Sequence, residues 1–273
     1  MHFVDRALAR RFESAEEMPQ VYHAQWCEMN QPSVGAAVEE IAGGHMIFAG
    51  LGSPIGRAVG MGFATSVTEA DFDQLEAFYF SRKAPSQTDY CPLTDISLLE
   101  IARKRGYTIA ELNNVLARKI DAGEKFPLPP GTFTIRPSAP EEGPAFSSIL
   151  RRCFFPNGGE PQGFDNMLLP MFSFPGSLTF VAEIDGHLVA TGAGLRIAGH
   201  RIVGLYGAGT LKENRGRGLQ TAMLQTRMRV AAESGCEYAV IVTQGGTTSQ
   251  RNAERLGFRV AYSKATLIKE YKP

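Results

Sequence analysis

Residues 210–224 read Thr-Leu-Lys-Glu-Asn-Arg-Gly-Arg-Gly-Leu-Gln-Thr-Ala-Met-Leu, a glycine- and arginine-rich turn that opens a helix. Residues 202–209 before it are apolar and interrupted by glycine, which predicts a strand with a bulge or a close backbone approach. Residues that can line one face of a helix then recur at helical spacing, at Leu219, Ala222, Met223, Thr226 and Val230. Because the first-turn N–H groups of a helix have no intrahelical acceptors, this turn predicts a phosphate-binding cradle.

The spacing of the glycines narrows the type of phosphate ligand. A Walker loop needs Lys and then Ser or Thr after its last glycine, but Leu219 and Gln220 follow Gly218. A dinucleotide fingerprint that begins at Gly216 needs a glycine where Thr221 stands. Both nucleotide interpretations are therefore weak.

The turn resembles the acyl-CoA signature of the GCN5-related N-acetyltransferases, the GNAT family. Arg215 and Gly218 match that signature, whereas Gln220 stands where a small residue is expected. The resemblance implies acetyl-CoA as co-substrate, with its pantetheine arm along the strand before the turn. The residues that it implies for cofactor binding are Ala208, Gly209, Thr210, Arg215, Gly216, Arg217, Gly218, Leu219, Gln220, Thr221 and Asn252.

The resemblance covers roughly residues 131 to 271. Asp185-Gly186 is a two-residue turn signal between two apolar runs and predicts a hairpin. Counterparts of the family's elements occur in chain order at 132–137, 178–184, 187–197, 238–243, 249–256 and 265–271, with Gly257-Phe258 before the last. The implied fold class is α/β, with a mixed and mostly antiparallel sheet flanked by helices.

The chain is long enough for two such domains in tandem. Residues 126–131 are proline-rich and predict a linker between a domain at 1–125 and a GNAT acetyltransferase domain at 132–273. Four pairs of similar residues are separated by 151 positions, among them Gly106 and Gly257 (257−106). This internal match predicts a degenerate copy of the same fold in the first half, although a shared Gly-aromatic pair also arises by chance.

The first half contains no Arg-x-x-Gly-x-Gly cradle, so we expect no CoA pyrophosphate there. Residues 45–50 and 57–63 flank a Gly- and Pro-containing segment and predict a hairpin. Thr68 and Asp71 resemble a capping box in front of a helix that reaches Phe80.

Composition restricts the classes of partner and location. Lys plus Arg equals Asp plus Glu, at 28 each, so no overall field recruits nucleic acid or an anionic membrane. The apolar runs fall short of the roughly 18 residues of a membrane span, and the N-terminus is not a secretory signal. The cysteines, at 27, 91, 153 and 236, are scattered, which predicts reduced thiols in a cytoplasmic protein without a metal site.

Acyl transfer to an amine needs a base for the amine and an acid for the departing thiolate. The family's acid is a tyrosine in the last helix, and residues 251–256 contain none. The replacement candidates are Tyr262 as acid, Glu183 as base and Ser249 near the sulfur. Their structural alternatives are a strand aromatic, a surface carboxylate and a helix N-cap, respectively.

The acceptor is the least determined part. Residues 154–164 and 167–174 are rich in aromatic side chains and correspond to the helices that wall the family's acceptor site; packing against the first half explains them equally well. Tyr206 faces either the acyl site or the core. The predicted function is acetyl transfer from acetyl-CoA to a primary amine of a small molecule or a peptide N-terminus, by a monomer or a homodimer. A non-catalytic acyl-CoA sensor and a structural interaction protein are the alternatives.

Overall fold

The computed structural model describes residues 3–160, 164 and 168–272. Parts of the two aromatic segments, at 161–163 and 165–167, lie outside the described residues. Contacts along the chain define two compact units, neither of them continuous in sequence. Unit 1 comprises Met1–Leu116, Val242–Gln250 and Arg259–Pro273, and unit 2 comprises Ala117–Ile241 and Arg251–Phe258. The predicted boundary at the proline-rich segment concerns domains in the sequence and stays a prediction.

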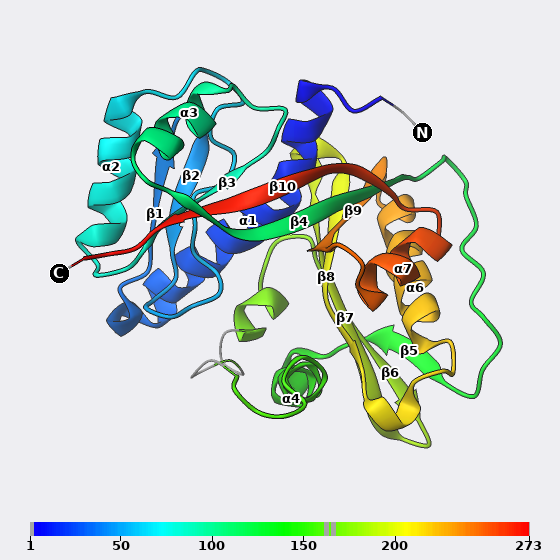
Figure 1. The fold of residues 1–273 in the computed structure, drawn as a ribbon. Coiled ribbons are helices and arrows are strands. Elements are labelled where there is room, and N and C mark those ends of the chain that lie inside the picture. Colours follow the sequence, from blue (N-terminus) through cyan, green and yellow to red (C-terminus); the bar gives the residue numbers. More distant parts are fainter. Residues whose placement is uncertain (1–2, 161–163, 165–167, 273) are drawn as a thin grey trace. The chain divides into compact units, whose positions relative to one another are not determined.

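Unit 2 is built on a sheet with strand order β9-β8-β7-β6-β5. The strands are β5 (Thr134–Pro137), β6 (Ser177–Ile184), β7 (His187–Ile197), β8 (Ile202–Thr210) and β9 (Tyr238–Gln244). The ladders are antiparallel except between β8 and β9, which run parallel. Helices α4 (Gly143–Phe154) and α6 (Leu219–Glu233) lie on opposite faces of this sheet (Figure 1). The prediction of a mostly antiparallel sheet flanked by helices is confirmed.

The hairpin of β6 and β7 shows how local sequence sets this topology. Asp185 and Gly186 have φ values of 49° and 75°, the left-handed pair that a tight two-residue turn requires. Beyond the turn, Ile184 pairs with His187 and the ladder continues to Ser177 opposite Leu195. The predicted hairpin is therefore confirmed, nearly to its ends.

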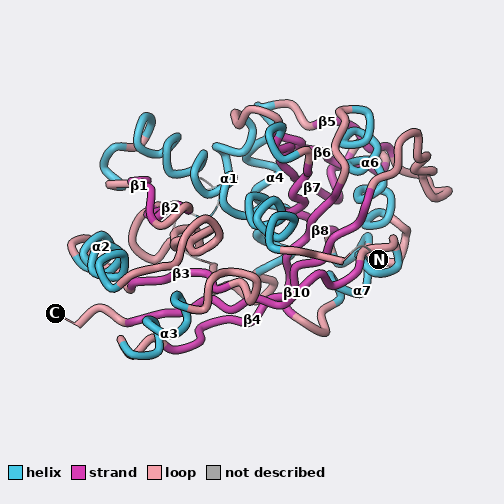
Figure 2. The backbone as a smooth tube through the Cα atoms, turned by 90° about the horizontal axis from the view of Figure 1, so that it is seen from above, coloured by secondary structure: helices cyan, strands magenta, loops and turns pink. Residues whose placement is uncertain are grey.

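Unit 1 combines a long N-terminal helix, a small hairpin and three strands in the order β3-β10-β4. Strands β4 and β10, far apart in sequence, run side by side (Figure 2). The helices are α1 (Arg6–Asn30), α2 (Glu69–Phe80), α3 (Ser97–Lys104) and, at the unit boundary, α7 (Thr248–Arg255). The strands are β1 (Ala37–Ile41), β2 (Gly44–Phe48), β3 (Ser86–Tyr90), β4 (Thr108–Lys119) and β10 (Arg259–Lys269).

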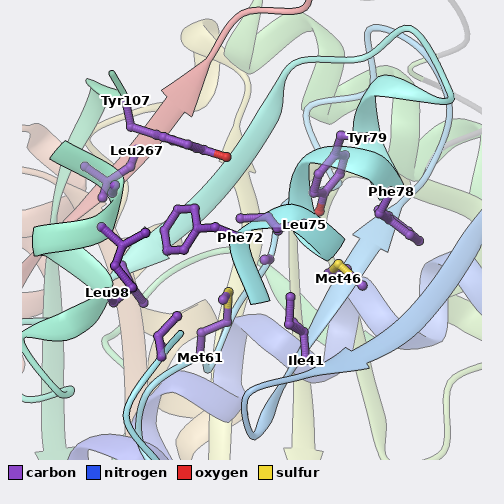
Figure 3. Close-up of a cluster of buried hydrophobic side chains, with 14 of the residues drawn as sticks. Ile41, Met46, Met61, Phe72, Leu75, Phe78, Tyr79, Leu98, Tyr107 and Leu267 are labelled. Carbon is purple, nitrogen blue, oxygen red and sulfur yellow. The ribbon is translucent and has the colours of Figure 1, made fainter. Parts of the chain in front are cut away.

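The apolar core of unit 1 forms around one face of α2 (Figure 3). Phe72 and Leu75 are completely buried, and the ring of Phe72 meets that of Tyr107 edge to face at 5.3 Å. Leu267 of β10 joins the same cluster. Burial of each such side chain contributes about 1.5 to 3 kcal/mol, so the C-terminal strand stabilises the N-terminal part of the chain.

The predicted hairpin of residues 45–50 and 57–63 is wrong. Strand β2 pairs instead with β1, through a turn in which Ala42 and Gly43 have positive φ. Residues 57–63 make only the isolated bridges His45–Val59 and Ala58–Thr88. The tight turn at Ala42 and Gly43 gives β2 a nearer partner. The segment of residues 57–63 still passes close to β2, because a Cβ at Gly44 would lie 2.1 Å from the Val59 carbonyl oxygen.

A group of buried charges ties β10 to α1 and β3 inside unit 1. Lys264, 2% exposed, contacts Glu13 and Asp89, each at 2.9 Å, and Glu16. Burial alone would lower the pKa of Lys264, but these three carboxylates raise it well above its usual value. The ammonium group therefore stays charged. Its removal would leave the buried Glu13 without this counter-ion, whereas Asp89 and Glu16 would keep their contacts with Arg57.

The spacing of 151 residues that was found in the sequence also relates helices and strands of the structure. Helices α3 and α7 have equal length and begin 151 residues apart (248−97), as do β4 and β10 (259−108). The glycines after the two helices, Gly106 and Gly257, have φ values of 80° and 86°. The next residue donates its N–H to an equivalent helix carbonyl in each case, Tyr107 to Ala102 and Phe258 to Ala253.

No helix among residues 3–160 and 168–272 is long and apolar enough to cross a membrane.

Near the β1–β2 turn of unit 1, a buried carboxylate pairs with a histidine. Glu17, 1% exposed, accepts hydrogen bonds from His45 Nδ1 (2.7 Å) and Arg10 Nη1 (2.6 Å). The hydrogen bond to Glu17 raises the pKa of His45 above its ordinary value of 6.5. Elsewhere on α1, burial lowers the pKa of His23 to about 4. The two histidines therefore affect stability in opposite directions as pH changes.

We expect His45→Gln to destabilise the protein in a pH-dependent manner. Since the folded-state pKa of His45 is raised, its stabilisation is fully present below about pH 6.5 and is lost as pH rises through the folded-state pKa. The difference in Tm between wild type and variant should thus be largest near pH 5.5 and should shrink towards about pH 8.5. Thermal melts across that range measure it, and subtraction removes the contribution of His23. A difference that grows with pH would contradict the assignment.

Candidate functional site

Strand β8 loses one of its two neighbours halfway along its length. Its parallel ladder with β9 covers only Ile202 to Gly204, opposite Tyr238 to Val240. The ladder with β7 continues to Thr210 opposite Ala190. Residues 205–210 therefore pair on one side only, and their backbone groups on the β9 side are available to another molecule.

A bulge interrupts the same part of β8. The register between β7 and β8 shifts between Thr191 and Ala193, and Gly207 on β8 has φ 54°. The adjoining backbone is tightly packed, because a Cβ on Gly209 would lie 2.8 Å from the Sγ atom of Cys153 on α4. The predicted bulge and close approach are confirmed, and both need glycine.

Arg227 binds the backbone next to the bulge from the α6 face of the sheet. Its Nη1 atom donates to the carbonyl oxygens of Ala193 (2.5 Å) and Tyr206 (3.2 Å), and Nε donates to that of Met223 (3.2 Å). The side chain is only 1% exposed, and burial lowers its pKa to about 10. A guanidinium with that pKa remains charged at neutral pH. The three carbonyl oxygens therefore take the place of the water molecules that would solvate an exposed guanidinium.

The turn after β8 leads into the open N-terminus of α6. Gly216 and Gly218 have φ values of 79° and 80°, and Gly218 is the N-cap residue. The first intrahelical bond of α6 runs from the N–H of Ala222 to the carbonyl of Gly218, at 3.0 Å. The N–H groups from Gly218 to Thr221 thus precede the helical ladder, and a glycine cap has no side chain that accepts from them.

The start of α2 in unit 1 provides a contrast. There the Thr68 hydroxyl accepts from the N–H of Asp71 (3.2 Å), and the Asp71 carboxylate accepts from the N–H of Thr68 (2.7 Å). Glu69 adds a second negative charge in the first turn. This capping box satisfies its own donors and repels an anion, so only α6 presents an anion-binding geometry of the two. The predicted capping box is confirmed.

The two arginines of the turn are exposed. The Nε atom of Arg215 donates to the carbonyl of Thr210 at 3.1 Å, which fastens the side chain to the end of β8. At the start of α6, Leu219 is buried, whereas Gln220 and Thr221 are partly exposed. The structure thus brings the predicted cofactor-binding residues from Ala208 to Thr221 together on one strand, one turn and one helix start.

Of the three predicted catalytic side chains, Glu183 alone belongs to the same unit as the turn before α6. Tyr262 belongs to unit 1, where its hydroxyl donates to Glu13 at 2.8 Å. Glu183 lies on β6, separated from β8 by β7, and forms an ion pair with Arg136. Their catalytic roles stay predictions, and both side chains already have strong partners.

Residues of α7 divide between the two units. Ser249 is exposed and lies in unit 1. The hydroxyl of Thr247, and not that of Ser249, accepts from the first turn of this helix, from the N–H of Gln250 at 3.3 Å. Asn252 is partly exposed and belongs to unit 2, together with the α6 turn.

The part of the chain that the structure describes contains no group of three or more His, Cys, Asp or Glu side chains that could hold a metal ion.

Comparison with known proteins agrees with this geometry. Residues 144–258 match the model of the acetyltransferase (GNAT) family. A GCN5-related N-acetyltransferase from Kribbella flavida superposes with a TM-score of 0.63 at 17% identity, over 90% of this chain and 95% of its own. A tandem GNAT protein from the clavulanic acid biosynthesis pathway gives 0.64 at 11% identity, over 97% and 95%. No curated protein matches the sequence.

Residues 144–258 have the GNAT acetyltransferase fold.

Within the GNAT fold of this chain, the buried position of Arg227 escaped the sequence analysis. Arg227 follows Met223 by four residues and so falls on the buried face of α6, but its charge indicated a surface position. The Tyr206 hydroxyl is buried and has no hydrogen-bond partner among the described residues. A charged residue at a core position of a helix is the signal that could have identified Arg227.

We expect Arg227→Met to destabilise unit 2, because the carbonyls of Ala193 and Tyr206 lose their donor. Each unsatisfied buried acceptor costs about 1 to 3 kcal/mol, and removal of the desolvated charge offsets part of this, so a net loss of about 2 kcal/mol in the free energy of unfolding is expected. Urea denaturation measures it. Arg229→Met, at an exposed position on the same helix, is the control, and equal stability of the two variants would contradict the role of Arg227.

Proposed function

We propose that this protein is an acetyl-CoA-dependent N-acetyltransferase. The observation that carries the proposal is the open N-terminus of α6 directly after a strand that has lost one neighbour. Such a helix start binds anions through its N–H groups and dipole, and the unpaired edge of β8 offers hydrogen bonds to an extended chain. A CoA molecule has both parts, a pyrophosphate and a pantetheine arm with two amides.

The residues of this region fit the two parts of CoA. The N–H groups from Gly216 to Thr221 would hold the pyrophosphate, and the guanidinium groups of Arg215 and Arg217 would neutralise it. The backbone of Ala208–Thr210 would bind the pantetheine. Gln220 adds a side-chain amide where the family signature has a small residue, and Asn252 of α7 is a further proposed contact.

The proposed reaction is direct acyl transfer. The nitrogen of a deprotonated primary amine attacks the thioester carbonyl carbon, and the carbonyl electrons move to oxygen. Collapse of the tetrahedral oxyanion breaks the C–S bond, and the sulfur leaves with the electron pair and takes up the proton that the amine released. Small-molecule amines and peptide N-termini are the proposed acceptors, because the equal numbers of acidic and basic residues favour no nucleic-acid partner. We place the reaction in the cytoplasm.

Proton transfer is the step for which Tyr262 and Glu183 were predicted. Tyr262→Phe separates two roles for that residue: loss of a general acid lowers kcat about a hundredfold, whereas loss of the bond to Glu13 lowers the Tm. Its buried contacts favour the second result. Glu183→Gln and Ser249→Ala test the remaining candidates in the same assay.

The first half is proposed to be a degenerate copy of the same fold, in a tandem arrangement. The equal spacing of α3 and α7, and of β4 and β10, supports duplication. Helix α2 would be the counterpart of α6, with a capping box in place of the open cradle. The copy in the first half would then have lost its CoA site while keeping its framework.

A non-catalytic acyl-CoA sensor is the second candidate. It is favoured by the sequence of α7, in which Arg251–Leu256 has no tyrosine, and by the absence of a carboxylate from residues 202–210. Both candidates predict CoA binding, and only the enzyme predicts turnover.

Calorimetric titration with acetyl-CoA, CoA and ATP tests the proposal directly. We expect micromolar binding of acetyl-CoA and CoA with little binding of ATP, followed by release of free thiol in the presence of amines. Binding without turnover over a broad amine panel would favour the sensor. No binding of any of the three would overturn both.

We expect Gly218→Trp to abolish acetyl-CoA binding, because the indole would occupy the space in front of the α6 N–H groups. Gly235→Trp at the other end of α6 is a matched control, since its φ of 77° imposes the same backbone strain as the 80° of Gly218. The two variants should lose similar stability, but only the first should lose affinity, by a hundredfold or more. Unchanged affinity in Gly218→Trp would exclude the cradle as the cofactor site.

A further inference from the structure

Tyr206 lies on β8 just beyond the point where the ladder with β9 ends. It is paired with Ala193 of β7, two residues from Thr191, which is opposite Gly209. Residues two apart on a strand share a face, so Thr191 and Ala193 point to the same side of β7. Directly opposite residues of neighbouring strands also share a face, so Tyr206 and Gly209 of β8 point to that side too. This is the α4 face, because the space next to Gly209 contains Cys153. The Tyr206 side chain therefore leaves the unpaired part of β8 on the face opposite α6.

The backbone of the same residue is held from the α6 side. Arg227 donates to the Tyr206 carbonyl, while the bulge at Gly207 follows directly. A buried guanidinium on one face thus fixes the position from which the phenol projects on the other. The Tyr206 ring begins from a rigid attachment, which is the condition for placing a hydroxyl accurately against a reacting group.

The hydroxyl of Tyr206 is buried, although part of the residue is accessible, and no described residue accepts or donates a hydrogen bond to it. An unsatisfied buried hydroxyl lowers stability, and folded proteins contain few of them. Burial also raises the pKa of Tyr206 far above its usual value of 10, so the proton stays on the oxygen. The group is therefore a neutral donor with no acceptor among the residues that the structure describes.

We propose that the Tyr206 hydroxyl is a catalytic hydrogen-bond donor to the oxygen of the reacting acyl group. This inference rests on the proposed acyl transfer. The carbonyl oxygen of the thioester becomes negative when the amine attacks, and a donor that is unused in the free protein gains most from that charge. Tyr206 keeps its proton throughout, so it changes no bond order and needs no regeneration. The unsatisfied hydroxyl would lower the stability of the free protein, and this loss would be offset when the hydroxyl donates to the acyl oxygen.

Tyr206→Phe tests the proposal with two opposite readouts. Removal of the hydroxyl should leave the Tm unchanged or higher, because an unsatisfied polar group is lost, and should lower kcat about a hundredfold with the affinity for acetyl-CoA unchanged. The matched control is Thr226→Val. Thr226 lies on α6, on the other face of the sheet. It is buried, and its hydroxyl also has no hydrogen-bond partner in the described part of the chain. It should match the Tm change and keep the kcat of the wild type.

The outcomes separate failure of this inference from failure of the proposed function. If acetyl-CoA binds and Tyr206→Phe keeps the kcat of the wild type, the hydroxyl is not catalytic and the acyltransferase assignment stands. If the Tm of Tyr206→Phe falls, the hydroxyl has a partner in solution, and the proposal is overturned on structural grounds alone. If wild type binds acetyl-CoA but turns over no amine, the acyltransferase assignment fails together with this inference, whereas absence of binding removes the cofactor site as well.

Discussion

The buried guanidinium of Arg227 is the interaction on which the site region depends. Its hydrogen-bond partners among residues 3–160 and 168–272 are carbonyl oxygens, from α6 itself, from β7 and from the bulged part of β8. These bonds fix the position at which β8 bends away from regular pairing, and so determine where its free edge begins. Because the open N-terminus belongs to the same helix, about two turns before Arg227, one residue joins the proposed pantetheine and pyrophosphate sites into a single rigid element.

Helices α2 and α6 show how little separates a closed helix start from an open one. Helix α2 begins with Thr68, Glu69 and Asp71, whose side chains occupy its N–H groups and add negative charge. Helix α6 begins with a glycine cap and neutral residues. The backbone geometry that attracts an anion is common to both, and a few side chains decide whether it is accessible.

Much of unit 2 was predictable because its signals are local. The Asp185-Gly186 turn, the glycines before α6 and the helical spacing after them each act over a few residues. Other pairings were not predicted. The turn at Ala42 and Gly43 that joins β1 to β2 is local but lacks a strong turn signature, and the partner of Glu183 is set by a strand register 47 residues away in sequence. Tyr262 was placed correctly on the last strand, but its contact with Glu13 spans 249 residues, which no local pattern specifies.

The position of β10 determines the order in which the chain acquires structure during synthesis. This strand lies between β3 and β4, and its Lys264 neutralises carboxylates on α1 and β3. A ribosome delivers residues 259–269 only after more than two hundred earlier residues have emerged. Until then unit 1 has an unpaired gap in its sheet, and the buried Glu13 lacks the ammonium group that neutralises it, whereas Asp89 already has Arg57. The N-terminal segment therefore cannot complete its sheet until the last residues of unit 2 have been synthesised. The fold has a high contact order, because contacts that stabilise this segment join residues far apart in sequence.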